Sequence, residues 1–79
     1  MNTKQKELTN ILEEYAAYLE LDGQEGRSHA YEKAARSIRT ASYLPPDPSN
    51  LTGVGDSIRT TIAKYQRSGE IPELEGLKE

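Results

Sequence analysis

Apolar residues recur at three- and four-residue steps along most of the chain, and this spacing places them on one face of an α-helix. The pattern predicts three long helices and a short fourth one, over residues 3–21, 27–42, 56–67 and from Pro72 through Leu77. No segment shows the strict alternation of apolar and polar residues that is typical of a strand. We therefore expect an all-α fold, a compact four-helix domain that spans residues 1–79.

Glycines and prolines mark the ends of these helices. Glycine suits the left-handed backbone that often follows a helix, and Gly23 and Gly69 stand after the first and third predicted helices. Residues 43–50 form a connector, because three of them are prolines, which cannot continue a helix. This connector holds at most one helical turn, over residues 48–51.

The stretch LTGVGD at residues 51–56 leads directly into the third predicted helix. A helix N-terminus leaves backbone N–H groups unpaired and carries partial positive charge. Glycines such as Gly53 and Gly55 let a phosphate approach those N–H groups closely. The same glycines also suit an ordinary corner between two helices, and the turn taken alone leaves both interpretations open.

The distribution of charge adds to the case for an anion site. The net charge of −3 is not typical of a nucleic-acid-binding domain. However, residues 1–25 carry two lysines and six acids (net −4), residues 26–67 carry seven basic residues and three acids (net +4), and residues 68–79 carry one lysine and four acids (net −3). The basic middle suggests a local anion site, whereas acidic ends that face it would form a salt-bridged surface.

The composition excludes several kinds of site. The chain has no cysteine and a single histidine, His29, so a disulfide framework and a thiolate or polyhistidine metal site are excluded. No apolar run is long enough to span a membrane, and the N-terminus lacks the basic and then apolar pattern of a secretion signal. We expect a cytoplasmic monomer without a membrane partner.

The pattern Leu51-x-Gly53-Val54-Gly55, with the apolar spacing of the helix after it, resembles a helix-hairpin-helix motif at about residues 48–67. Such motifs bind the DNA backbone without reading sequence. Three further segments resemble the amino-terminal domain of family X DNA polymerases, the DNA polymerase β group: its second helix, the exit from its hairpin, and the first helix of its bacterial and archaeal members. They are Arg27-x-x-Ala30-Tyr31-x-x-Ala34-Ala35-x-x-Ile38, Ser68-Gly69-Glu70-Ile71-Pro72-Glu73-Leu74-Glu75-Gly76-Leu77 and Leu19-Glu20-Leu21-Asp22-Gly23.

In that family the domain is a four-helix unit that binds the 5′-phosphate on the downstream side of a DNA gap. The resemblance therefore implies sequence-independent binding of gapped or nicked DNA, as part of a repair polymerase that acts in base excision repair. It also implies that residues 1–79 are a fragment of a longer DNA-directed polymerase, a nucleotidyltransferase. The polymerase active site and its Mg²⁺ would then lie beyond residue 79.

The resemblance assigns DNA contacts residue by residue. Arg27 falls where the family grips the phosphate, and a guanidinium suits that role because it offers paired donors. Arg27 could instead pair with Glu25 or Asp22, and Tyr31 could be a core residue. The residues that the family pattern and their neighbouring charges place at DNA are Arg27, Tyr31, Gly53, Val54, Gly55, Asp56, Ser57, Arg59 and Lys64. His29 lies either beside the phosphate or exposed.

Two features of the hairpin affect how it would bind. Family members bind a monovalent cation, Na⁺ or K⁺, through backbone carbonyls at positions that match Ser49, Leu51 and Val54. The Asp56 carboxylate is expected to cap the third helix, where it would compete with a phosphate and repel it. We therefore expect DNA binding that is weak and depends strongly on salt. No other cofactor is expected in this domain.

Some family members also remove a 5′-deoxyribose phosphate with a lysine nucleophile, whose position is Thr61 here, with Ser57 at its basic companion. A hydroxyl cannot form an imine, so we expect no catalytic residue in this domain. Lys64 and Lys33 are the substitutes available to a lyase with a displaced lysine. A domain of this shape could also serve as a non-catalytic docking domain of a structure-specific nuclease or as a protein-interaction bundle. The acidic ends and Asp56 favour the bundle.

Overall fold

The computed structural model describes residues 3–43, 47 and 50–79. Ser49 and most of the predicted connector lie outside these residues. The described residues form four helices and no strand, which confirms the predicted all-α fold. The helices are α1 (Thr3–Leu21), α2 (Glu25–Thr40), α3 (Asp56–Ser68) and α4 (Pro72–Lys78).

Helix α2 begins and ends two residues earlier than the apolar pattern predicts. The Ser28 N–H donates a hydrogen bond to the Gln24 carbonyl at 2.9 Å, and this bond closes the first turn directly after Gln24. At the other end, Ala41 has extended backbone angles (φ −71°, ψ 144°), so the helix stops before it. The apolar stripe starts only at Tyr31, which is why the pattern places the helix start too late.

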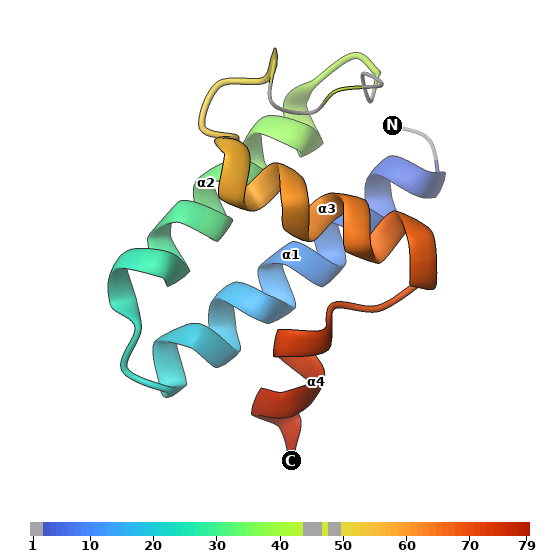
Figure 1. Ribbon diagram of the computed structural model, residues 1–79. Coiled ribbons are helices and arrows are strands. Elements are labelled where there is room, and N and C mark those ends of the chain that lie inside the picture. The colour runs from blue at the N-terminus through green and yellow to red at the C-terminus, as the bar shows by residue number, and fades with distance from the viewer. Residues whose placement is uncertain (1–2, 44–46, 48–49) are drawn as a thin grey trace.

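Two glycines end helices as predicted. Gly23 has φ +84° and Gly69 has φ +82°, both in the left-handed region that favours glycine. The Gly69 N–H donates to the Tyr65 carbonyl at 2.7 Å and closes α3. The turn at Gly23 reverses the chain, so that α1 and α2 run antiparallel and side by side, while α3 crosses over this pair (Figure 1).

The core lies where α1, α2 and the crossing α3 meet. Ala34 and Ala35 on α2 are both 0% exposed, and their small side chains let α1 approach closely. Helix α4 lies against α1 and is anchored by Leu74. The buried apolar side chains are Leu8, Leu12, Tyr15, Ala16, Leu19, Tyr31, Ala34, Ala35, Ile38, Val54, Ile58, Ile62, Ile71 and Leu74.

Buried polar side chains tie α1 to both ends of α2. Gln5 Nε2 donates to the carbonyls of Ile38 (2.9 Å) and Ala41 (2.7 Å). Both carbonyls lie at the C-terminal end of α2, where no following helical N–H group is available to donate to them. Near the start of α2, the Ser28 hydroxyl donates to the Ala16 carbonyl at 2.8 Å. These bonds fix α2, and therefore the residues it carries, relative to α1.

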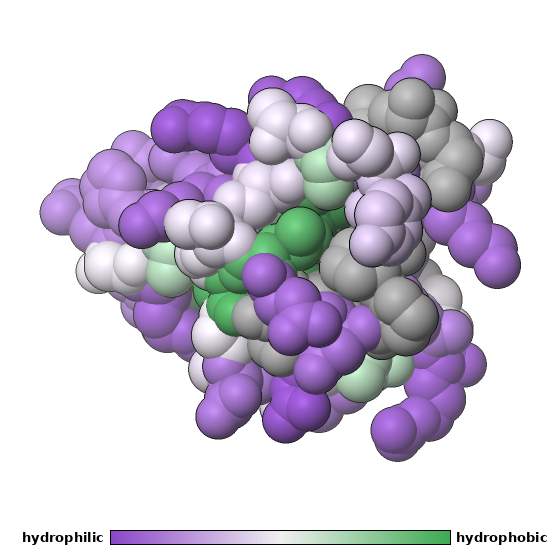
Figure 2. Space-filling view, turned by 90° about the horizontal axis from the view of Figure 1, so that it is seen from above, coloured by the Kyte–Doolittle hydropathy of each residue, from purple (hydrophilic) through white to green (hydrophobic). Residues whose placement is uncertain are grey.

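The surface is largely hydrophilic. Seen from above, polar side chains cover most of that face and apolar ones show in a central strip (Figure 2). Among the described residues, the exposed large apolar side chains are Leu21 (84%) and Tyr43 (67%). Within the same ranges, no helix is both long and apolar enough to cross a membrane.

Candidate nucleic-acid interface

The hairpin turn is held against α2. Gly53 has φ +85°, a left-handed conformation that favours glycine, and the Lys33 side chain packs so closely that a Cβ atom there would lie 3.0 Å from its Cγ. The Ser37 hydroxyl donates to the Thr52 carbonyl. Val54 is buried, and its N–H donates to the Leu51 carbonyl at 3.2 Å. The turn is thus a fixed platform at the start of α3.

Asp56 does not cap α3, contrary to the prediction. The helix begins at Asp56 itself, so the N-cap residue is Gly55, which has no side chain to accept a hydrogen bond. The Asp56 side chain is 93% exposed, and its Oδ1 lies 3.9 Å from Nη2 of Arg59. The Gly55 N-cap therefore leaves the first N–H groups of α3 without a capping side chain. The Asp56 charge still lies at this end of the helix, where it opposes an anion.

Arg27 presents a fixed positive charge at the surface. Its Nη2 donates to the Tyr15 hydroxyl at 2.9 Å and its Nη1 to Oε1 of Gln24 at 2.9 Å, and the guanidinium carbon lies 5.8 Å from the centre of the Tyr15 ring. Within the described ranges, no ion pair joins Arg27 to Glu25 or Asp22, the two acids with which the sequence could pair it. The hydrogen-bond partners that orient this guanidinium, Tyr15 and Gln24, are both neutral.

Tyr31 and Thr61, two positions that the family pattern singles out, meet in the interior. The Tyr31 and Thr61 hydroxyl oxygens are 2.7 Å apart, and the side chains are only 2% and 8% exposed. The Tyr31 ring also packs on Tyr15 with 4.7 Å between ring centres. Of the two interpretations of Tyr31, core packing is the one that the structure supports, and Thr61 occupies the nucleophile position with a hydroxyl that is already hydrogen-bonded.

Lys64 is held by an acid that the sequence patterns did not single out. Its Nζ lies 3.0 Å from Oε1 of Glu73, in the first turn of α4. A hydrogen bond from the backbone of Glu73 itself, and then the one from Lys64, lower the pKa of the Glu73 carboxyl, and Arg27 adds to the effect. On the other side of Arg27, burial raises the pKa of the Tyr15 hydroxyl, and Arg27 partly opposes this.

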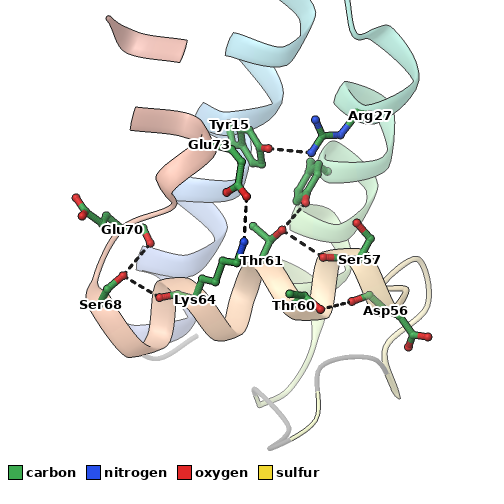
Figure 3. Close-up of polar contacts among 11 residues, drawn as sticks. Tyr15, Arg27, Asp56, Ser57, Thr60, Thr61, Lys64, Ser68, Glu70 and Glu73 are labelled. Carbon is green, nitrogen blue, oxygen red and sulfur yellow. Dashed lines mark hydrogen bonds and ion pairs between the residues drawn. The ribbon is translucent and has the colours of Figure 1, made fainter. Parts of the chain in front are cut away.

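These side chains form one group to which every helix contributes. Figure 3 shows labelled members from α1, α2, α3 and α4 converging around Thr61. We call this group the polar cluster, and its residues are Tyr15, Arg27, Tyr31, Thr61, Lys64 and Glu73. Tyr15 and Glu73 were not among the site residues predicted from the sequence. The available signals were that Tyr15 is the polar-tipped member of the α1 stripe and that Glu73 follows the N1 proline of α4.

The remaining predicted residues lie away from the cluster or at its edge. Arg59 lines a hollow on α3 at the edge of the cluster, together with Thr60, Ala63, Arg67 and the cluster residue Lys64. His29 is exposed beside Glu32, with 3.9 Å between Nδ1 and Oε2. Lys33 packs on Gly53 at the hairpin rather than on Thr61. Ser57 is an exposed residue in the first turn of α3, and its carbonyl accepts a hydrogen bond from Thr61 at 3.2 Å.

A family model described as a helix-hairpin-helix domain matches residues 3–71, from the start of α1 to the residue before α4. No curated protein and no solved structure matches the chain. The family match covers both the hairpin turn and all of the polar cluster except Glu73.

Proposed function

Because this chain belongs to the helix-hairpin-helix domain family, whose members typically bind DNA, we propose that it binds gapped or nicked DNA at the 5′-phosphate. The observation that carries this proposal is the Arg27 guanidinium, which is exposed, oriented by Tyr15 and Gln24, and, among the described residues, not engaged in an ion pair with Glu25 or Asp22. A guanidinium held in one orientation loses little freedom when it binds, and its paired donors match the oxygens of a phosphate.

The hairpin turn supplies the second contact in this proposal. The N–H groups at the start of α3 have no capping side chain within the part of the chain that the structure describes, and they follow a turn that Val54 and the Lys33–Gly53 contact hold in place. They would bind a backbone phosphate, with no side chain reading the bases. In the same proposal, the carbonyls of Leu51 and Val54, together with Ser49, would bind Na⁺ or K⁺.

We further propose that the parent protein is a family X DNA polymerase that acts in base excision repair. The supporting observation is the order of the sequence segments that resemble this family, from the first helix to the exit of the hairpin. The polymerase active site and its Mg²⁺ would then belong to another domain, and the four-helix domain would dock the DNA end.

An NMR titration with a short gapped duplex at low salt tests the proposal. We expect chemical-shift changes at Arg27 and at the amides of residues 53–57 that are larger with a 5′-phosphate than with a 5′-hydroxyl. Raising the salt concentration should reduce them, because phosphate contacts release counterions. Equal shifts with both duplexes would leave DNA binding in place and refute the 5′-phosphate site. Shifts confined to other surfaces would refute the proposed mode of binding.

Lyase activity by the family route is expected to be absent. Thr61 has no nitrogen with which to form a Schiff base, and the Lys64 ammonium is held 3.0 Å from Glu73. Borohydride reduction in the presence of an abasic-site substrate should therefore leave no covalent protein–DNA adduct. An adduct that is formed by the wild type and lost in Lys64→Ala or Lys33→Ala would identify a displaced nucleophile and overturn this expectation.

A further inference from the structure

The ion pair between Lys64 and Glu73 places an anion inside the group of side chains that would receive a phosphate. The pair is partly exposed, with 43% of the Lys64 side chain and 45% of the Glu73 side chain accessible. Lys64 comes from α3 and Glu73 from α4, so the contact depends on how the two helices meet rather than on their local sequence. An exposed ion pair can exchange partners when another anion arrives.

Glu73 is well placed to remain charged. It lies in the first turn of α4 directly after Pro72, where its carboxylate is hydrogen-bonded to its own backbone N–H. Its lowered pKa keeps the carboxylate ionised at neutral pH. The polar cluster therefore contains two cations, Arg27 and Lys64, and one fixed anion.

We propose that Glu73 is an internal competitor of the DNA 5′-phosphate, which occupies Lys64 in the free protein and thereby limits the affinity of the polar cluster for that phosphate. This inference rests on the proposed function. A phosphate that binds Arg27 and Lys64 together takes Lys64 from Glu73 and then lies close to the negative charge of Glu73. Both effects weaken binding, and both act inside the site rather than through the net charge of the domain.

The charge on the ligand determines which DNA is affected most. A terminal phosphate monoester carries about 1.5 to 2 negative charges at neutral pH, whereas a phosphate within the backbone carries one. Repulsion by Glu73 is therefore larger for the terminal phosphate. Removing the Glu73 charge should strengthen binding of 5′-phosphorylated DNA more than that of 5′-hydroxyl DNA, and should slow dissociation of the phosphorylated end.

The test compares Glu73→Gln with Glu70→Gln. Both variants remove one negative charge, and Glu70 is an exposed residue only three positions away that lies outside the polar cluster. Fluorescence anisotropy at low salt measures the affinity for duplexes that carry a one-nucleotide gap and either a 5′-phosphate or a 5′-hydroxyl. We expect E73Q to tighten binding of the phosphorylated duplex by about two- to fivefold, and E70Q to change both duplexes alike and by less.

A Lys64→Ala background shows whether Glu73 acts through Lys64. In that background, E73Q should lose the part of its effect that comes from freeing Lys64 and keep the part that comes from removing the repulsion, so its effect on the phosphorylated duplex should be smaller than in the wild type. Equal effects of E73Q and E70Q, or weaker binding by E73Q, would overturn the inference while leaving the proposed function intact if the wild type still prefers the phosphorylated duplex. A wild type that binds both duplexes equally would refute the proposed function, and the inference with it.

Discussion

Truncation of Leu12 to alanine is expected to lower the free energy of unfolding by about 2–5 kcal/mol. Leu12 is 0% exposed and lies in the middle of α1, in the core cluster that also contains Ala34 and Ala35 of α2. Because Ala34 and Ala35 already bring the two helices close together, the surrounding backbone has little room to collapse into the space that the leucine leaves. A chain of this length has a total stability on the order of 4–12 kcal/mol, so the loss would be a large part of it.

Leu21→Ala is the matched control for this prediction. It removes the same atoms from the same helix, but Leu21 is 84% exposed, and we expect a change within about 0.5 kcal/mol. Urea denaturation followed by far-UV circular dichroism measures both variants, and Leu12→Ala should shift the midpoint without changing the slope. Equal midpoints for the two variants would show that the apolar stripe of α1 is not the core of the domain.

The fold could be predicted because its signals are local. The helical spacing of Leu8, Leu12 and Leu19 identifies the buried face of α1, and the glycines at 23 and 69 are needed where the chain turns left-handed. Each of these signals lies within a few residues of the element that it specifies. The start of α2 was misplaced because the residues from Glu25 to Ala30 are helical without contributing to the apolar stripe.

The site could be predicted only in part. Arg27 and the turn at Gly53 were identified from sequence patterns, and both lie at the surface or on the fixed hairpin. The prediction that Asp56 caps α3 was wrong by one position. The N-cap is the residue before the first one with helical backbone angles, and that residue is Gly55. The contacts of Tyr15 with Arg27 and of Lys64 with Glu73 join different helices. Such contacts depend on helix crossing, for which the local sequence carries no signal.

Replacement of Arg27 by alanine is expected to weaken binding of a 5′-phosphorylated gap by about 10- to 150-fold and to affect a 5′-hydroxyl gap much less. Hydrogen bonds to charged groups contribute about 1.5–3 kcal/mol, which corresponds to this range. Arg27→Lys keeps the charge but loses the paired donors of the guanidinium, one of which holds the Tyr15 hydroxyl, so its affinity should fall between those of the wild type and the alanine variant.

Arg36→Ala separates the contact made by Arg27 from its contribution to net charge. Arg36 lies on the same helix, nine positions and about two and a half turns away, so it faces the opposite side of α2. There it lines a hollow with Glu32 and Arg39, outside the polar cluster. Loss of its charge should weaken binding of both duplexes modestly and equally, because long-range attraction does not depend on the DNA end. If Arg27→Ala behaved in the same way, Arg27 would act only as part of the overall field, and the 5′-phosphate would have to bind elsewhere on the domain.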